Sequence, residues 1–126
     1  MNRELAKRPH EDLTVWQQAM SLVEQVYACS SKFPDSERFG LTAQLRRAAI
    51  SVPSNIAEGA ARRSTPEYLR FLSIARGSLS EPDTQLQIAY RLGYSEFPPE
   101  IKTRIDDVFA MLTGLMNALQ AREATR

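Results

Sequence analysis

The chain has 126 residues, a formal net charge of +1, 43% hydrophobic residues and 25% charged residues. This length predicts a single domain, residues 1–126 with a loose tail at about 1–10, and the near-average composition excludes fibrous and disordered chains. Every uninterrupted apolar stretch falls far short of the roughly 18 residues that cross a bilayer, so we expect a cytoplasmic protein with no membrane partner.

The first predicted helix spans residues 12–32 and carries two apolar rows. Asp12 is the expected N-cap, and Phe33-Pro34 ends the helix because a residue before proline is pushed out of the α region. The rows are Leu13, Trp16, Met20, Val23, Tyr27 and Ser30, and Val15, Ala19, Leu22, Val26, Cys29 and Phe33. Together they cover roughly half of the circumference, more than the ~100° stripe that faces one core.

Either a broad core within one chain or a second copy of the chain covers this surplus. We predict the second case, a homo-oligomer. The predicted interface residues are Val15, Ala19, Leu22 and Val26.

The second predicted helix runs from Leu41 to Gly59 and holds Pro53 in its middle. An interior proline removes one backbone hydrogen bond and costs about 3 kcal/mol. The apolar row nevertheless stays in step from Leu45 to Ile56, so we predict a kinked but continuous helix.

The third predicted helix opens at Ser64-Thr65-Pro66-Glu67, a capping residue followed by proline in the first turn, and ends at Leu92-Gly93-Tyr94. Pro82 lies inside it, and the apolar residues again keep step across the proline. The fourth predicted helix starts after Phe97-Pro98-Pro99. Its apolar row is Ile101, Ile105, Val108, Leu112, Leu115 and Leu119.

Four helical segments without any period-two alternation predict an all-α, antiparallel up-and-down four-helix bundle. A turn near Ser64 would pair the second and third helices so that residue numbers sum to about 128, with Pro53 beside Ala75 and Asn55 beside Ser73. The facing side chains are small, so we expect the two backbones to approach closely. Hydroxyl and amide groups on this seam are expected to satisfy the carbonyl that the proline leaves free.

Basic residues are concentrated in the middle of the chain. Residues 38–76 hold seven of the 16 basic residues and two of the 15 acidic ones, a formal charge of +5, while the rest of the chain carries −4. A polar stripe on the second helix consists of Arg47, Ser51, Ser54, Glu58 and Arg62. Because guanidinium groups suit phosphate, we predict phosphate contacts with nucleic acid at Arg46, Arg47, Arg62, Arg63, Arg70 and Arg76. A surface lattice of salt bridges is the alternative.

The sequence offers no constellation for catalysis. His10, the only histidine, falls in the predicted tail, and the chain has no Glu-x-x-His motif and no glycine-rich phosphate loop. Cys29, the only cysteine, is interpreted as a small buried hydrophobic residue. We therefore expect a protein that is not an enzyme, with no catalytic residues, no cofactor and no metal site.

Five short motifs stand out in the middle of the chain. They are Phe33-Pro34, Phe39-Gly40-Leu41, residues 44–48 (QLRRA), residues 51–59 (SVPSNIAEG) and Ala75-Arg76-Gly77-Ser78. Together they resemble the four-helix-bundle family encoded by intervening sequences of bacterial 23S ribosomal RNA. The resemblance extends over most of the chain up to about Tyr94. It departs at Glu81-Pro82-Asp83, where the family more often has an unbroken helical run.

The resemblance implies a homopentamer, and it extends to the accessory variability determinants of diversity-generating retroelements. Those relatives are basic pentamers that work with a reverse transcriptase and its nucleic acid. The implied partners are further copies of this chain, RNA or DNA, and a reverse transcriptase. We therefore predict a non-enzymatic homo-oligomer that associates with nucleic acid through its arginines. The alternative is a protein-interaction scaffold or accessory subunit with no direct nucleic-acid binding.

Overall fold

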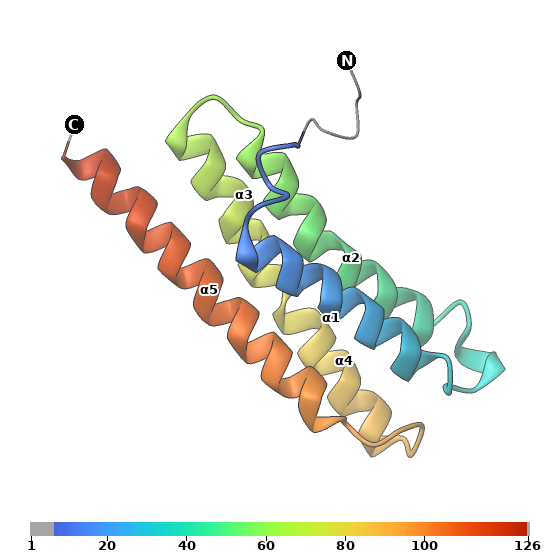
Figure 1. Ribbon diagram of the computed structural model, residues 1–126. Helices are drawn as coiled ribbons and strands as arrows, with labels where there is room; N and C mark the ends of the chain where they lie inside the picture. The colour runs from blue at the N-terminus through green and yellow to red at the C-terminus, as the bar shows by residue number, and fades with distance from the viewer. Residues whose placement is uncertain (1–6, 126) are drawn as a thin grey trace.

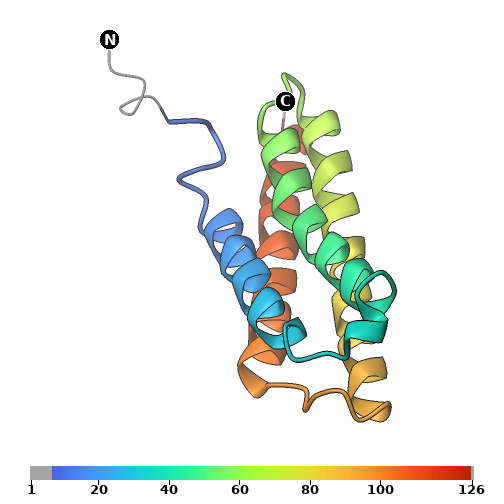
Figure 2. The same ribbon diagram turned by 90° about the vertical axis from the view of Figure 1, so that its right-hand side faces the viewer.

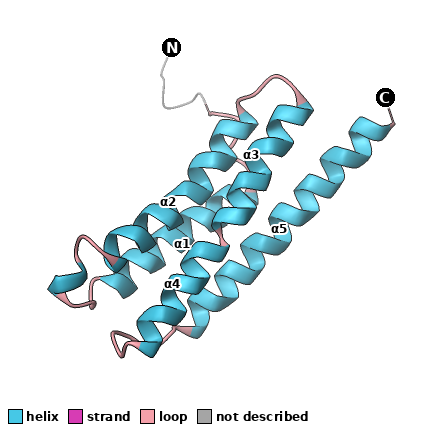
Figure 3. Ribbon diagram, turned by 180° about the vertical axis from the view of Figure 1, so that it is seen from behind, coloured by secondary structure: helices cyan, strands magenta, loops and turns pink. Residues whose placement is uncertain are grey.

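The computed structural model describes residues 7–125, and all regular secondary structure in that range is helical (Figure 1 and Figure 3). The elements are α1 (Thr14–Ser30), the short 3-10 turn η2 (Asp35–Glu37), α2 (Leu41–Ala60), α3 (Thr65–Ser78), α4 (Ser80–Arg91) and α5 (Pro99–Ala124). Leu79 alone separates α3 from α4, and the two helices run end to end as one arm of the bundle. The predicted all-α four-helix bundle is therefore confirmed, with α3 and α4 together as its third arm.

Successive arms run in opposite directions, so the turn between α2 and α3 lies at the same end of the bundle as the C-terminal end of α5 (Figure 2). The first arm packs on α2 and α5, and the third arm packs on the same two neighbours. One apolar core fills the space between the four arms, and its completely buried side chains include Leu22, Leu45, Leu72 and Leu112.

The first helix is shorter than the sequence predicts. Its N-cap is Leu13, which makes no capping hydrogen bond, so the prediction of Asp12 as N-cap is wrong. Asp12 instead forms an ion pair with Lys7 at 3.0 Å, within a turn that also brings the His10 ring against Trp16. Of the predicted loose tail, residues 1–6 lie outside the described residues.

The structure also corrects which apolar row of α1 faces the core. The sequence predicts Val15, Ala19, Leu22 and Val26 at an interface between copies, but all four are at most 5% exposed within a single chain. A second copy cannot reach side chains that α2 and α5 already cover. The other row contains the partly exposed residues, among them Met20 at 41%.

Helix α2 continues through Pro53, as predicted, without a break from Leu41 to Ala60. The carbonyl that Pro53 cannot bond belongs to Ala49, and the side-chain hydrogen bonds of this segment go to other carbonyls, so the prediction that hydroxyl and amide groups on the seam satisfy Ala49 is not confirmed. Three side chains donate to carbonyls of the same helix: Ser51 Oγ to Ala48 (2.6 Å), Ser54 Oγ to Ile50 (2.8 Å) and Asn55 Nδ2 to Ser51 (2.7 Å). Such local bonds supply polar contacts around the interruption.

Helices α2 and α3 approach most closely at Gly59. A Cβ atom at this position would lie 2.8 Å from Phe71 Cβ and 3.2 Å from the backbone oxygen of Tyr68. These partners agree with the predicted pairing of residues whose numbers sum to about 128. Only glycine fits here without moving one helix away from the other.

The third arm begins as predicted, because Ser64 Oγ accepts a hydrogen bond from the Glu67 amide at 3.3 Å. Its prediction as one continuous helix is wrong, since helical hydrogen bonding is interrupted at Leu79. Pro82 explains the interruption: it has no N–H for the carbonyl of Ser78, four residues earlier, and its ring crowds that carbonyl. The arm ends at Arg91, followed by Gly93 with a positive φ of 77°.

In α5 the inward row differs from the predicted one at a single position. Met116 is buried at 7% exposure, whereas Leu115 is only half-buried and packs at the edge of the core. A flexible methionine fills the space that a strict heptad pattern assigns to leucine.

Candidate nucleic-acid interface

The six predicted arginines do not form one surface. Arg46 packs at the seam between α1 and α2, where its guanidinium lies 4.4 Å from the Tyr27 ring centroid. Its Nε donates to Ser30 Oγ at 2.8 Å. Arg46 therefore joins two helices, which gives it a structural contribution that the sequence pattern did not reveal.

Arg76 lies on the opposite side of the bundle, against α5. Its Nη1 donates to Thr113 Oγ1 at 3.3 Å, and its guanidinium lies 5.6 Å from the centre of the Phe109 ring. Arg76 and Arg46 thus flank different arms, and Arg46 lines a pocket together with Arg47 and Phe39.

A groove with polar side chains runs between α2 and the third arm. Its lining residues include Arg47, Ser51 and Asn55 from α2, Ile74 and Ser78 from α3, and Glu81 and Gln85 from α4. The groove has a volume of about 520 Å³, and we call it the polar groove. Of the predicted polar stripe of α2, only Arg47 and Ser51 line it. Asn55 faces the groove, whereas Ser54 lines the other side of α2.

Two more of the arginines lie toward the α2–α3 turn. Arg70 precedes Ile74 by one turn of α3 and therefore lies on the same side of that helix, and Arg62 follows α2, which ends at Ala60. The guanidinium groups of Arg62 and Arg70 each lie 4.7 Å from the centroid of one aromatic ring, that of Phe71. This shared ring holds two cations side by side on the surface.

Carboxylates accompany these two arginines. Arg62 pairs with Glu58 at 2.8 Å, as predicted, and Arg70 pairs with Glu67 at 3.2 Å. All four side chains are well exposed, and exposed ion pairs contribute only about 0–1 kcal/mol. A phosphate group can therefore replace either carboxylate at little cost.

Arg47 and Arg63 complete the set. Both are exposed, and neither forms an ion pair with any residue between 7 and 125. Arg47 lies at the α4 end of the polar groove and Arg63 lies in the α2–α3 turn. The 13 residues from Arg47 to the end of α2 at Ala60 span about 20 Å, and Arg62 follows in the turn.

An exposed apolar surface covers the other side of α2, where that helix meets α1. It is formed by Trp16, Met20, Val23, Tyr27 and Ile50, and we call it the apolar face. Met20, Tyr27 and Ile50 are each about 40% exposed. Phe39, in the loop before α2, extends this surface with 88% of its side chain exposed.

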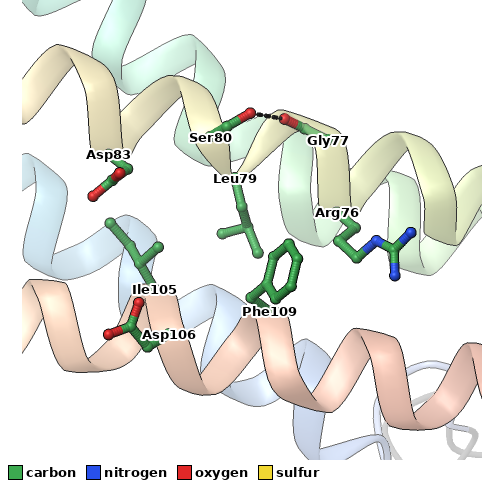
Figure 4. Close-up of a pocket in the computed structure, with 8 residues that line it drawn as sticks. All are labelled: Arg76, Gly77, Leu79, Ser80, Asp83, Ile105, Asp106 and Phe109. Carbon is green, nitrogen blue, oxygen red and sulfur yellow. Dashed lines mark hydrogen bonds between the residues drawn. The ribbon is translucent and has the colours of Figure 1, made fainter.

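A smaller pocket of about 300 Å³ lies between the third arm and α5 (Figure 4). Leu79, Ile105 and Phe109 form its apolar wall, with Arg76 at one end and Asp83 and Asp106 at the other. Lys102 lies 3.7 Å from a carboxylate oxygen of both aspartates. The exposed Lys102 of α5 therefore balances part of the negative charge at the acidic end of the pocket.

At the end of the bundle away from the α2–α3 turn, one carboxylate links two segments by hydrogen bonds. Glu37 accepts a hydrogen bond from the Leu41 amide at 3.0 Å and another from the Tyr94 hydroxyl at 2.9 Å. These bonds, first that of Leu41 and then that of Tyr94, lower the pKa of Glu37. The bond to the Glu37 carboxylate in turn raises the pKa of Tyr94. The contact ties the start of α2 to the loop after α4.

Two further properties bear on the kind of protein. Between residues 7 and 125, no three His, Cys, Asp or Glu side chains gather closely enough to hold a metal ion. In the same part of the chain, each helix is too short or too polar to traverse a membrane.

Sequence reasoning missed the third-arm side of the groove. Ile74, Ser78, Glu81 and Gln85 follow the same spacing of three and four residues as the stripe on α2, and this spacing was the available signal. The interruption at Pro82 obscured it, because a break in a helix ordinarily shifts the phase of its faces.

Comparison with known proteins gives one result. The family model described as 23S rRNA-intervening sequence protein matches residues 11–114, which include α1 to α4 and more than half of α5. A search of curated protein sequences finds no match.

Proposed function

We propose that the chain, which belongs to the 23S rRNA-intervening sequence protein family, is a non-enzymatic homo-oligomer. It binds nucleic acid along the polar groove. The observations that carry the nucleic-acid part are Arg47 in the lining of the polar groove and the two exposed arginines, Arg62 and Arg70, that lie against the Phe71 ring. The family membership does not by itself assign a ligand, because function depends on the site and not on the fold.

Phosphate is the ligand group that suits these arginines best. Guanidinium groups bind phosphate oxygens with two parallel hydrogen bonds, and the shared Phe71 ring already orients two of them. Arg47 lies about 20 Å along α2 from the end of that helix, so a strand that reaches all three arginines would run lengthwise beside α2. Contacts of this kind are sensitive to salt and carry little sequence information.

The test compares two triple variants with equal changes in net charge. In the first, Arg47, Arg62 and Arg70 are replaced by alanine; in the matched control, the exposed residues Lys32, Arg91 and Arg122 are replaced instead. Binding to mixed-sequence RNA and DNA is measured by fluorescence anisotropy over a range of salt concentrations.

We expect the first variant alone to lose most of its affinity, with the slope of log K against log salt reduced by about 2, since each phosphate contact contributes roughly 0.7 to 0.9. Equal losses in both variants would show a non-specific effect of net charge and would contradict the proposed groove. Absence of binding by the wild-type protein at low salt would refute nucleic-acid association altogether.

The oligomer is proposed to form through the apolar face. Monomeric proteins rarely expose a continuous apolar surface of this kind without a partner. We expect a light-scattering mass several times the chain mass of 14.2 kDa, and five times that mass if the pentamer implied by the resemblance is formed.

A matched pair of variants locates the interface. Met20→Arg places a charge on the apolar face, and Ile88→Arg places one on α4 at a side chain of nearly equal exposure, 41% against 42%. Met20→Arg should lower the mass and Ile88→Arg should leave it unchanged. Unchanged mass in both variants would place the interface elsewhere.

A protein-interaction scaffold is the second candidate, and the same apolar face favours it. In that case the face would receive a different protein, for which a reverse transcriptase is the partner that the resemblance implies. A monomeric wild-type protein that binds no nucleic acid would favour this candidate over the first.

A further inference from the structure

The middle of the polar groove presents several hydrogen-bond acceptors, and two of its side chains already donate to backbone carbonyls of α2. Asn55 Nδ2 donates to the Ser51 carbonyl at 2.7 Å, and Ser51 Oγ donates to the Ala48 carbonyl at 2.6 Å. The oxygens of both side chains remain as acceptors. Glu81, on the opposite wall, is exposed. Its ionised carboxylate has no hydrogen to donate and acts only as an acceptor.

Gln85 adds an acceptor that lacks a partner. Its Oε1 atom is buried, and no donor within the described residues reaches it. The side chain lines the groove, and the terminal torsion of glutamine rotates easily. A donor that enters the groove would therefore find this oxygen unoccupied, which is uncommon for a buried polar atom.

The remaining groups complete the chemistry of a nucleotide site. Ile74, 41% exposed, offers an aliphatic surface to the flat face of a ring, and Arg47, elsewhere in the same lining, is available for a phosphate. The volume of about 520 Å³ is within the range of pockets that bind small molecules. A concave groove between two helices admits an unpaired base, whereas a double helix is convex and has its pairing edges occupied.

We propose that the polar groove binds unpaired bases that carry an exocyclic amino group, with Glu81 and Gln85 accepting hydrogen bonds from that group. The inference rests on the proposed nucleic-acid binding and specifies which part of the ligand the groove recognises. Cytosine presents an amino group where uracil presents a carbonyl oxygen, and that oxygen would face the acceptors of the groove. The site therefore favours cytosine over uracil, although the two rings have the same size.

The experiment compares short single-stranded oligomers of cytidine and of uridine at neutral pH and constant salt, by fluorescence anisotropy. This pair holds ring size constant, so the amino group is the main difference. Deoxycytidine and thymidine oligomers give the same comparison for DNA. The variant is Glu81→Gln/Gln85→Leu, and the matched control, Glu96→Gln/Gln87→Leu, makes the same changes at exposed positions outside the groove.

We expect the wild-type protein and the control to bind cytidine oligomers about fivefold or more tightly than uridine oligomers. The groove variant should bind both equally while keeping its affinity for uridine. Equal affinity of the wild-type protein for both oligomers, or a preference that survives in the groove variant, would overturn the inference and leave phosphate binding intact. Failure of the wild-type protein to bind either oligomer at low salt would refute the proposed function and this inference together.

Discussion

Helices α2 and α3 approach closely at Gly59, so Gly59→Ala tests the pairing of these two helices. The added Cβ would lie 2.8 Å from Phe71 Cβ and 3.2 Å from the Tyr68 backbone oxygen. Neither atom can move by side-chain rotation, so the two helices must separate locally. Overpacking of this kind costs about 1–3 kcal/mol.

Gly114 provides the matched control, because it lies in the interior of α5 and a Cβ there would meet no atom within 4 Å. Alanine is favoured over glycine in a helix by about 1 kcal/mol at both positions. This preference cancels when the two variants are compared. The difference in unfolding free energy between Gly59→Ala and Gly114→Ala is therefore the steric cost alone, about 1–3 kcal/mol.

Thermal unfolding followed by circular dichroism measures this difference. For a chain of this size, 1 kcal/mol shifts Tm by about 4 °C, so Gly114→Ala should melt about 4–12 °C above Gly59→Ala. Both variants are compared at one protein concentration, since self-association makes Tm depend on concentration. Equal melting temperatures would show that α2 and α3 do not approach at Gly59 as described.

Three further changes have defined outcomes. Ser64→Ala removes the hydroxyl that caps α3 and should lower the free energy of unfolding by about 1 kcal/mol in a urea titration, whereas no change would contradict the capping bond. Arg46→Ala should destabilise the fold by about 1–2 kcal/mol, because Arg46 bonds to α1. RNA affinity should stay nearly unchanged, because Arg46 does not line the polar groove. A large loss of affinity would show that Arg46 contacts nucleic acid. Glu37 has a lowered pKa in the folded protein, so the stability that its charge contributes is present above its unfolded value near 4.5 and is lost as pH falls through the lower folded value. The stability difference between wild type and Glu37→Gln should therefore shrink on acidification from pH 6, and a difference independent of pH would exclude this effect of the carboxylate charge.

The start of α3, the end of α4 and the start of α5 were predictable because local chemistry sets them. Ser64 followed by Pro66 starts α3, Gly93 with its positive φ follows the end of α4, and Pro99 opens α5. Each residue acts through its own backbone angles or through a bond to a neighbour in sequence. The three- and four-residue spacing of apolar side chains likewise predicts the four arms of the bundle.

Tertiary packing decided which faces of those helices meet. Helix α1 carries two equivalent apolar rows, and only its position between α2 and α5 determines that Leu22 is buried while Met20 is exposed. The arginines are separated for the same reason: Arg46 and Arg47 are adjacent in sequence, but successive residues of a helix point about 100° apart and meet different neighbours. One therefore packs against α1 and the other lines the polar groove, a distinction set by contacts between residues far apart in the chain.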